Sequence, residues 1–196
     1  MKTFFTCILI LIFFNASFSE EKLDQYFTFM GFTLEESKIS DVVDKLGDTV
    51  IHKEGDAAES YTGVCYYSSE NDVTILFESG EMGGGVTLLG YKVVQGQGSK
   101  YPCREIGGLS KESFNIGSLS IDEHLEDAIK SLPQNIESRD GLTFFYMDKI
   151  PFTKEEIDKL HVQDMEYAFW FQGVTIEIFA NKNKVSGYSI YKVTSW

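Results

Sequence analysis

The chain has 196 residues, with 17 lysine and arginine residues against 30 aspartate and glutamate residues, which gives a formal net charge of −13. This acidity argues against binding to nucleic acid or to anionic lipid, because both depend on lysine and arginine to neutralise phosphate. It favours solubility and, where the partner is a protein, a cationic partner such as a basic enzyme.

A secretory signal peptide is predicted at residues 1–19. Lys2 precedes the apolar run 4–14, and small residues including Ser17 and Ser19 follow, which is the order of charged, apolar and cleavage segments in such peptides. The run is shorter than the about 20 apolar residues that span a bilayer. We therefore expect an exported protein, periplasmic or secreted, with no integral membrane segment after cleavage. A buried core helix is the alternative interpretation.

Residues 24–95 are predicted to form a first α+β unit. Its helix shows apolar residues at the spacing of one helical face, namely Ile39, Val42, Val43 and Leu46. Thr33 with Glu36 has the spacing of a capping box at the helix start. Aromatic and β-branched residues over 61–94 then predict three strands joined by two hairpins.

Two turns of this unit carry acidic residues. Glu70 and Asp72 lie at the tip of the first hairpin, and Glu81 lies among the glycines of residues 80–85. A phosphate-binding loop is excluded at the second turn, because no lysine follows the glycines and the next element is a strand, not a helix. The glycines are expected to supply positive φ values in a hairpin connection.

A connector at residues 96–112 holds one of two cysteines that remain once Cys7 leaves with the signal peptide. In an oxidising compartment the pair Cys65 and Cys103 predicts a disulfide, which would stabilise the fold by about 4 kcal/mol in the chain-entropy model. Two free thiols are the alternative. Neither cysteine has a second one at the spacing of a metal site, so no metal is expected.

Residues 113–196 are predicted to repeat the plan of the first unit. The apolar residues of the second helix are Leu125, Ala128, Ile129 and Leu132. Ser120 with Glu123 again has capping-box spacing, and strands are predicted over 167–193. The expected fold class is therefore α+β, with two tandem units that each pack a helical segment on a three- to four-stranded antiparallel sheet.

An insertion in the second unit carries its own capping-box pattern, Thr153 with Glu156. This pattern predicts one extra short helix within the second unit.

Catalytic motifs are missing from the sequence. His52, His124 and His161 each lack the neighbouring residues of a metal or nucleophile site, and no cofactor is expected. Glu177 is the only acidic residue that we place within a strand between apolar neighbours, where it fits a solvent-facing position. The sequence predicts a protein that is not an enzyme; a hydrolase would require a pocket with perturbed acids.

Two features resemble the β-lactamase inhibitory protein family. They are the order glycine, cap, helix and Leu-Gly before the strands, and the closing pattern F-x-N-K-N-K-V-x-G-Y-x-I-Y at residues 179–191. The resemblance implies tandem repeats and an inhibitory acid on the first hairpin, here Glu70 or Asp72. The short disulfide within the family's first unit has no counterpart in this chain. The features also resemble outer-membrane assembly lipoproteins of the SmpA/OmlA type.

The predicted function is binding of a protein partner through an outer aromatic sheet face, with an inhibitor-like action on that partner as one form of it. Tyr67, Trp170 and Tyr188 are expected to supply contact area. The hairpin-tip acids Asp72, Glu70 and Glu81 are expected to meet a cationic site on the partner. The alternative is a cell-envelope assembly or structural factor of the SmpA/OmlA type.

Overall fold

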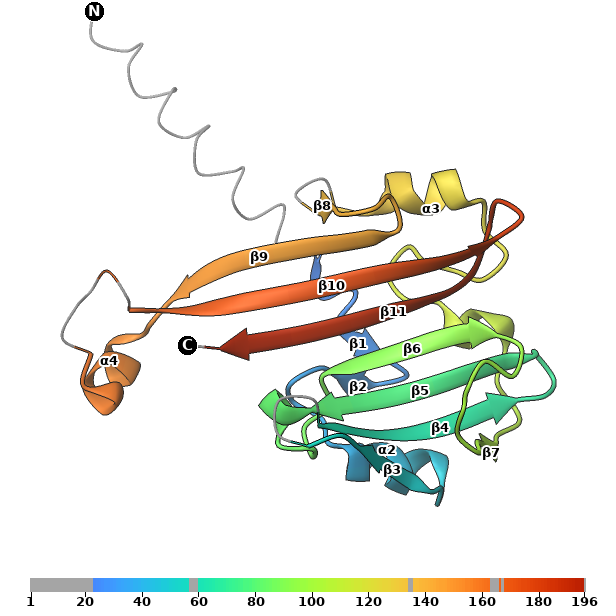
Figure 1. Ribbon diagram of the computed structural model, residues 1–196, viewed down its shortest axis with the longest axis horizontal. Helices are drawn as coiled ribbons and strands as arrows, with labels where there is room; N and C mark the ends of the chain where they lie inside the picture. Colours follow the sequence, from blue (N-terminus) through green and yellow to red (C-terminus); the bar gives the residue numbers. More distant parts are fainter. Residues whose placement is uncertain (1–22, 57–59, 134–135, 163–165, 167, 196) are drawn as a thin grey trace, which may run out of the picture.

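The computed structural model describes residues 23–56, 60–133, 136–162, 166 and 168–195 (Figure 1). The signal peptide predicted at residues 1–19 lies outside these residues. In the part of the chain that is described, no helix is long and apolar enough to cross a membrane.

Strands dominate the structure. They are β1 (Thr28–Phe29), β2 (Phe32–Thr33), β3 (Ile51–Glu54), β4 (Tyr61–Ser68), β5 (Val73–Gly80), β6 (Gly90–Gln95), β7 (Arg104–Glu105), β8 (Glu137–Ser138), β9 (Thr143–Pro151), β10 (Phe169–Asn181) and β11 (Lys184–Ser195). The helices are α2 (Ile39–Leu46), α3 (Leu125–Ser131) and α4 (Lys154–Leu160), with 3₁₀ turns η2 (Glu81–Gly83) and η3 (Lys111–Phe114). Strands β1 and β2 pair with each other, and the other nine form one sheet.

The predicted fold class, two tandem units that each carry a helix on their own sheet, is wrong. The nine-stranded sheet runs in the order β3-β4-β5-β6-β11-β10-β9-β8, with β7 beside β4. Strand β6 from the first half pairs with β11 from the second, from Val94 opposite Gly187 to Gly90 opposite Tyr191. The fold is mostly β, with 45% of residues in strands and 20% in helices. Pairing β6 with β11 removes two exposed sheet edges, which separate units would have to protect.

The hairpins predicted in the first half are confirmed, since β4, β5 and β6 form an antiparallel meander. In the second half the structure differs from the expected three short strands. Strand β10 is continuous over 13 residues and turns into β11 through Lys182 and Asn183. Both turn residues have positive φ, 50° and 64°, as the two-residue turns that match strand twist require.

One face of the sheet forms the core. Side chains alternate between faces along a strand, so the cross-strand partners Tyr66, Ile75, Val93, Tyr188 and Ile178 form one buried row across five strands. Further strand residues, the segment before α2, α2 itself and residues 114–132 add to the same cluster. In Figure 1 these elements lie on one side of the sheet.

The helices begin later than the capping patterns predict, except in the insertion. Thr33 belongs to β2, so helix α2 begins only after Lys38. The backbone N–H of Lys38 donates to the carboxylate of Asp41 at 2.8 Å. Helix α3 follows His124 rather than Ser120.

The extra helix predicted in the insertion is confirmed as α4, with the expected capping box. In it, the hydroxyl of Thr153 accepts from the backbone of Glu156, and the Glu156 carboxylate accepts the backbone N–H of Thr153.

The opposite, outer face of the sheet is covered only in part. The connector after β6 crosses this face and is fixed by the predicted disulfide, which is confirmed: Cys65 and Cys103 have Cα atoms 4.5 Å apart. Strand β7 extends the attachment, because the backbone N–H of Ile106 donates to the carbonyl of Tyr67 at 2.8 Å.

Strands β9 and β10 continue beyond the end of β6 as an arm, which projects to the left in Figure 1. The arm consists of residues 147–151 of β9, residues 169–173 of β10 and helix α4 at its tip. Trp170 fixes α4 to the strands: its Nε1 donates to Glu156 at 2.9 Å, and its ring packs edge-on against Phe152 at 5.0 Å.

Candidate functional site

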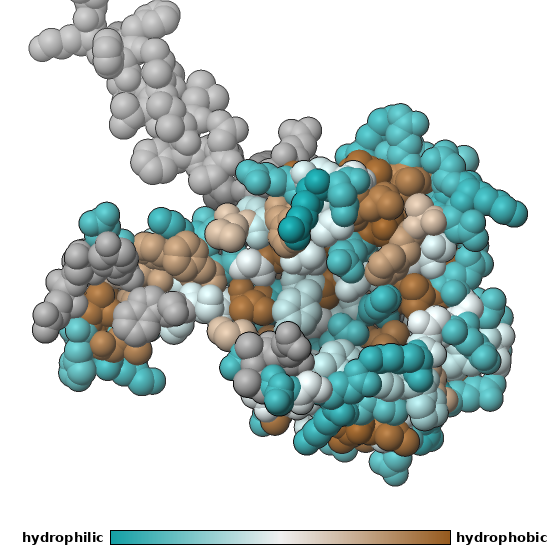
Figure 2. Space-filling model, in the orientation of Figure 1, coloured by the Kyte–Doolittle hydropathy of each residue, from teal (hydrophilic) through white to brown (hydrophobic). Residues whose placement is uncertain are grey.

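The outer face of the sheet is where the exposed aromatic and acidic side chains gather. Figure 2 shows this face, with apolar surface along the arm and hydrophilic surface over the connector side. Two features stand out there, a cleft bounded by the connector and a strip of apolar side chains on the arm.

The first hairpin tip brings three predicted residues together. The hydroxyl of Tyr67 donates to Asp72 at 2.8 Å, and Asp72 itself lies in the turn with a positive φ of 53°. This hydrogen bond to the carboxylate is the main reason that the pKa of Tyr67 is raised. Glu70, also exposed, accepts the backbone N–H of Gly108 at 3.3 Å and so contacts the segment after β7.

The other predicted site residues lie apart from this tip. Glu81 is exposed and opens η2 at the opposite end of β5, where Gly84 and Gly85 have the positive φ values expected from the sequence. Trp170 is half-buried between the arm and α4.

Tyr188 is completely buried on the core face and cannot contact a partner from this position. Alternation along a strand does not reveal which of its two faces is turned inward.

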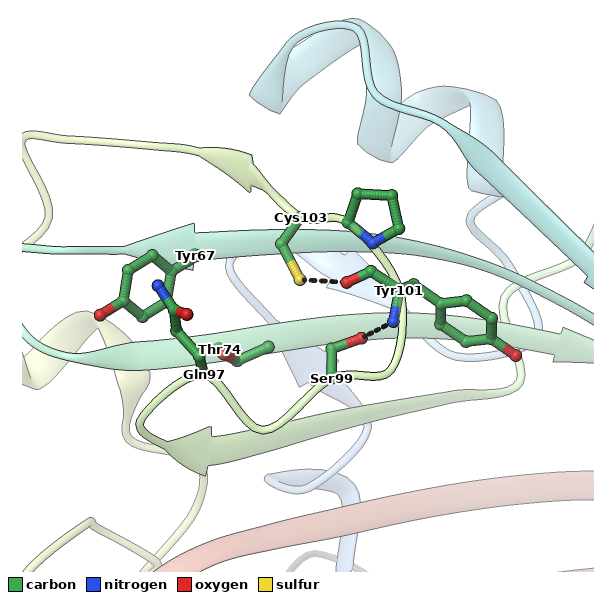
Figure 3. A pocket seen from close by; sticks show the side chains of 7 residues that line it. Tyr67, Thr74, Gln97, Ser99, Tyr101 and Cys103 are labelled. Carbon is green, nitrogen blue, oxygen red and sulfur yellow. Dashed lines mark hydrogen bonds between the residues drawn. The ribbon is translucent and has the colours of Figure 1, made fainter.

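A small cavity of about 230 Å³ lies beside the disulfide, under the connector (Figure 3). Its lining residues are Tyr67, Thr74, Gln97, Ser99, Tyr101, Pro102 and Cys103. The backbone N–H of Tyr101 donates to Ser99 Oγ at 3.0 Å, and the Sγ of Cys103 lies 3.4 Å from the Tyr101 carbonyl oxygen. These contacts shape the connector loop locally and hold Tyr101 in place.

A larger cleft of about 460 Å³ opens on the other side of Tyr101. Its lining residues are Glu54, Tyr61, Leu76, Glu78, Lys92, Gly98, Ser99, Lys100 and Tyr101. The volume falls in the range of about 300–1,000 Å³ that is typical of ligand sites. The ring of Tyr101 stacks on His52 at 4.2 Å and lies nearly parallel to Tyr61 at 5.9 Å, so that the wall of the cleft is aromatic.

Glu78 occupies the centre of an unusual row of residues in the sheet. Its direct cross-strand partners are Gly63 on β4 and Gly90 on β6. A Cβ atom at Gly63 would collide with the phenol of Tyr61, and one at Gly90 would lie 2.6 Å from the ring of Tyr191. The two glycines therefore let two tyrosine rings lie flat on the sheet, one on each side of Glu78.

Burial perturbs the acid–base chemistry of this row. Desolvation raises the pKa of Glu78, the positive charge of Lys92 and the Tyr61 hydrogen bond lower it, and the charge of Glu177 raises it. Desolvation, followed by the charge of Glu78, also raises the pKa of Tyr61 and of Tyr191. The carboxyl group of Glu78 is thus poorly solvated and its tyrosine neighbours stay protonated at neutral pH.

The second feature of the outer face lies on the arm and on Phe145 of β9 at the base of the arm. The register places Phe145, Met147, Phe169 and Phe171 on the outer side of β9 and β10, and we call these four residues the arm strip. Met147 is 74% exposed, Phe171 38% and Phe145 37%. The ammonium group of Lys149 lies over the rings of Phe169 and Phe171, 4.4 and 5.6 Å from their centroids.

Sequence reasoning missed the cleft. The sequence singles out Glu177 as an acidic residue within a strand. Glu78 also lies within a strand, and it is Glu78 that lines the cleft together with residues of the connector. The signal available in the sequence is the set of glycines on the neighbouring strands, whose partners only the register reveals. Within the described residues, no group of three or more histidine, cysteine, aspartate or glutamate side chains is arranged to hold a metal ion.

Comparison of the chain with models of protein families, with curated protein sequences and with solved structures finds no match. The resemblance to β-lactamase inhibitory proteins and to SmpA/OmlA lipoproteins therefore stays a prediction from the sequence, and the geometry of the outer face supplies the grounds for a function.

Proposed function

We propose that the protein is an exported, non-enzymatic protein-binding module that places the outer face of its sheet against a cationic protein, in the manner of an inhibitor. The arm strip supplies the apolar contact area. The acids of the hairpin tips, Glu70 and Asp72 at one end of the sheet and Glu81 at the other, supply attraction at the rim. Tyr67 supports the first tip by its hydrogen bond to Asp72.

The observation that carries the proposal is the exposure of the arm strip. Met147, Phe171 and Phe145 are exposed close to one another on the paired strands β9 and β10. Contiguous apolar side chains at a surface mark interaction sites, and methionine and aromatic residues are enriched in interfaces. Trp170 has a supporting role in this account, because its contacts with Glu156 and Phe152 hold α4 at the tip of the arm.

The charge of the chain selects the kind of partner. A net charge of −13 repels acidic proteins and attracts basic ones over distances of about a Debye length, 8–10 Å at physiological salt. Association should therefore weaken as salt is added, mainly through a slower association rate.

A hydrolase, the enzyme class considered from the sequence, would need a perturbed acid with a partner group placed for attack or proton transfer. Glu78 meets the first condition. The hydroxyl that is hydrogen-bonded to Glu78 is that of Tyr61, which donates at 3.4 Å and has a raised pKa, so it is a weak nucleophile at neutral pH. These contacts favour a role in recognition.

The test uses the mature protein as an immobilised bait. Proteins of the envelope and of the secreted fraction are captured at low salt, identified by mass spectrometry, purified and titrated against the bait by calorimetry. The double variant Met147→Ser, Phe171→Ser should bind at least about tenfold more weakly, a loss of about 1.4 kcal/mol. Val50→Ser is the matched control, because Val50 is 57% exposed and lies outside the arm.

The proposal predicts a basic partner, salt-sensitive binding and a loss that is confined to the arm variant. A partner whose affinity is the same for wild type, the arm variant and the control would show that the arm strip is not the interface. Binding that does not change between 50 and 500 mM salt would remove the electrostatic part of the proposal.

A further inference from the structure

Glu78 is a carboxylate with no ion pair among the described residues, although the charge of Lys92 acts on it from a greater distance. Its one hydrogen bond in the described chain comes from Tyr61 at the long distance of 3.4 Å, and no lysine or arginine of the described residues forms an ion pair with it. A half-buried carboxylate in this situation has lost solvation without an ionic partner to replace it. Such a group binds a cation that enters its cleft more strongly than an exposed carboxylate does.

Neither of the two lysines that line the cleft forms an ion pair with Glu78. Lys100 pairs with Glu54 at 2.5 Å, which neutralises both of these charges. The ammonium group of Lys92 lies over the ring of Phe179, 4.5 Å from its centroid, and acts on Glu78 only by its charge. Glu78 is therefore the one carboxylate lining the cleft that forms no ion pair within the described residues, and the charge of Lys92, which has no ion pair there either, opposes an entering cation.

The shape of the cleft suits a long side chain with a charged end. Tyr61 and Tyr101 form an aromatic wall, and Leu76 adds apolar surface beside Glu78. Lysine and arginine bury their methylene groups against such surface and place the charged group at a polar end. Aromatic rings beside the carboxylate add cation–π attraction.

We propose that this cleft receives a basic side chain, lysine or arginine, of the protein partner, with the carboxylate of Glu78 as its counter-ion. The inference rests on the proposed function and deepens it, since it assigns the cationic feature that the partner must present. Gly63 and Gly90 let the rings of Tyr61 and Tyr191 lie beside the carboxylate, because a Cβ atom at either position would collide with one of these rings.

The cleft can be tested without the partner. The ¹⁵N-labelled mature protein is titrated at low salt with n-butylammonium and n-butylguanidinium, which copy the ends of lysine and arginine, and with neutral n-butanol. We expect saturable amide shifts at residues 61–63, 78 and 90 with a Kd of about 1 mM, typical of small fragments. Saturation with either cation should also lower the pKa of the Glu78 carboxyl, measured by ¹³C NMR, because the cation favours its charged form.

Variants sharpen the result. Glu78→Gln should weaken both cations at least about tenfold, and Lys92→Gln should strengthen them, because it removes the competing internal charge. Glu36→Gln is the matched control, since it deletes the same charge at an exposed position before α2. If Glu78→Gln proves unfolded, the pKa measurement on the wild type decides alone.

The inference is overturned if butanol binds as tightly as the cations, if the shifts persist in Glu78→Gln, or if the Glu78 pKa does not move at saturation. None of these results depends on the arm strip. If the cleft does not bind the cations but the arm variant still loses affinity for the partner, the inference is overturned and the proposed function stands.

Discussion

Removing the disulfide between Cys65 and Cys103 should cost a large part of the stability of the fold. The two residues are 38 positions apart in the chain, and closing a loop of that length lowers the entropy of the unfolded state by an amount worth about 4 kcal/mol at 25 °C. Small domains are stable by only about 5–15 kcal/mol in total. The reduced protein should therefore unfold at a much lower urea concentration while keeping the same fold.

Two preparations separate the bond from its sulfur atoms. Wild-type protein in reductant keeps both side chains and should lose about 4 kcal/mol. The double variant Cys65→Ala, Cys103→Ala should lose about 1 kcal/mol more, comparable to the deletion of one buried methyl group, because Cys65 is fully buried. Urea titrations followed by circular dichroism and by tyrosine fluorescence supply both free energies of unfolding.

The native contacts of the connector do not depend on the bond alone. Tyr101 stacks on His52 and Ile106 pairs with Tyr67, so the native connector should stay in place after reduction. A loss below about 1 kcal/mol in both preparations would refute the chain-entropy reasoning for this loop. It would mean that the unfolded chain already holds these segments together.

Three further changes probe the packing of the sheet by thermal and urea unfolding. Gly90→Ala should lower the free energy of unfolding by about 1–3 kcal/mol through overpacking, because the added Cβ would lie 2.6 Å from the ring of Tyr191. In the control Gly107→Ala, the added Cβ meets only one atom, at 3.6 Å. Equal losses of stability in the two variants would refute the close-approach reasoning. Tyr188→Phe should be neutral or stabilising, because this buried hydroxyl has no hydrogen-bond partner among the described residues, and a loss above about 1 kcal/mol would show that a partner exists. Because the pKa of Glu78 is raised above its ordinary value of 4.5, the folded state binds more protons and its stability falls as pH rises from 4.5 through the folded pKa. Glu78→Gln should lack this fall and exceed the wild type in stability at pH 8 but not at pH 4; parallel pH profiles would contradict the assigned burial.

The parts of the fold that local sequence signals control were predictable. The meander over 61–94 and the helix capped by Thr153 and Glu156 follow from neighbouring residues, and the cysteine pair follows from the oxidising compartment that the sequence predicts. Pairing of β6 with β11 joins segments that are distant in the chain, and the residues of either strand do not indicate with which other strand it pairs. Local patterns therefore favour two tandem units, a prediction that is wrong because the strands of both halves join in one sheet.

The candidate site was predictable to a smaller degree for the same reason. The acids at the hairpin tips lie in turns, as their residue types indicate. Tyr188 is predicted on the outer face but is buried. Period-two alternation separates the two faces of a strand, but it does not indicate which face is buried. The cleft at Glu78 exists because the connector folds back over the sheet, and only the three-dimensional path of the chain reveals that contact.

The central place of β11 has a consequence for the order in which the protein can assemble. Among the described strands β11 comes last along the chain, yet it lies between β6 and β10 in the middle of the sheet. Until it arrives, β6 presents an open edge beside the buried row of the first half, a state prone to wrong pairing. The sheet can therefore be completed only after β11 has been made and has inserted between two strands that precede it in the chain.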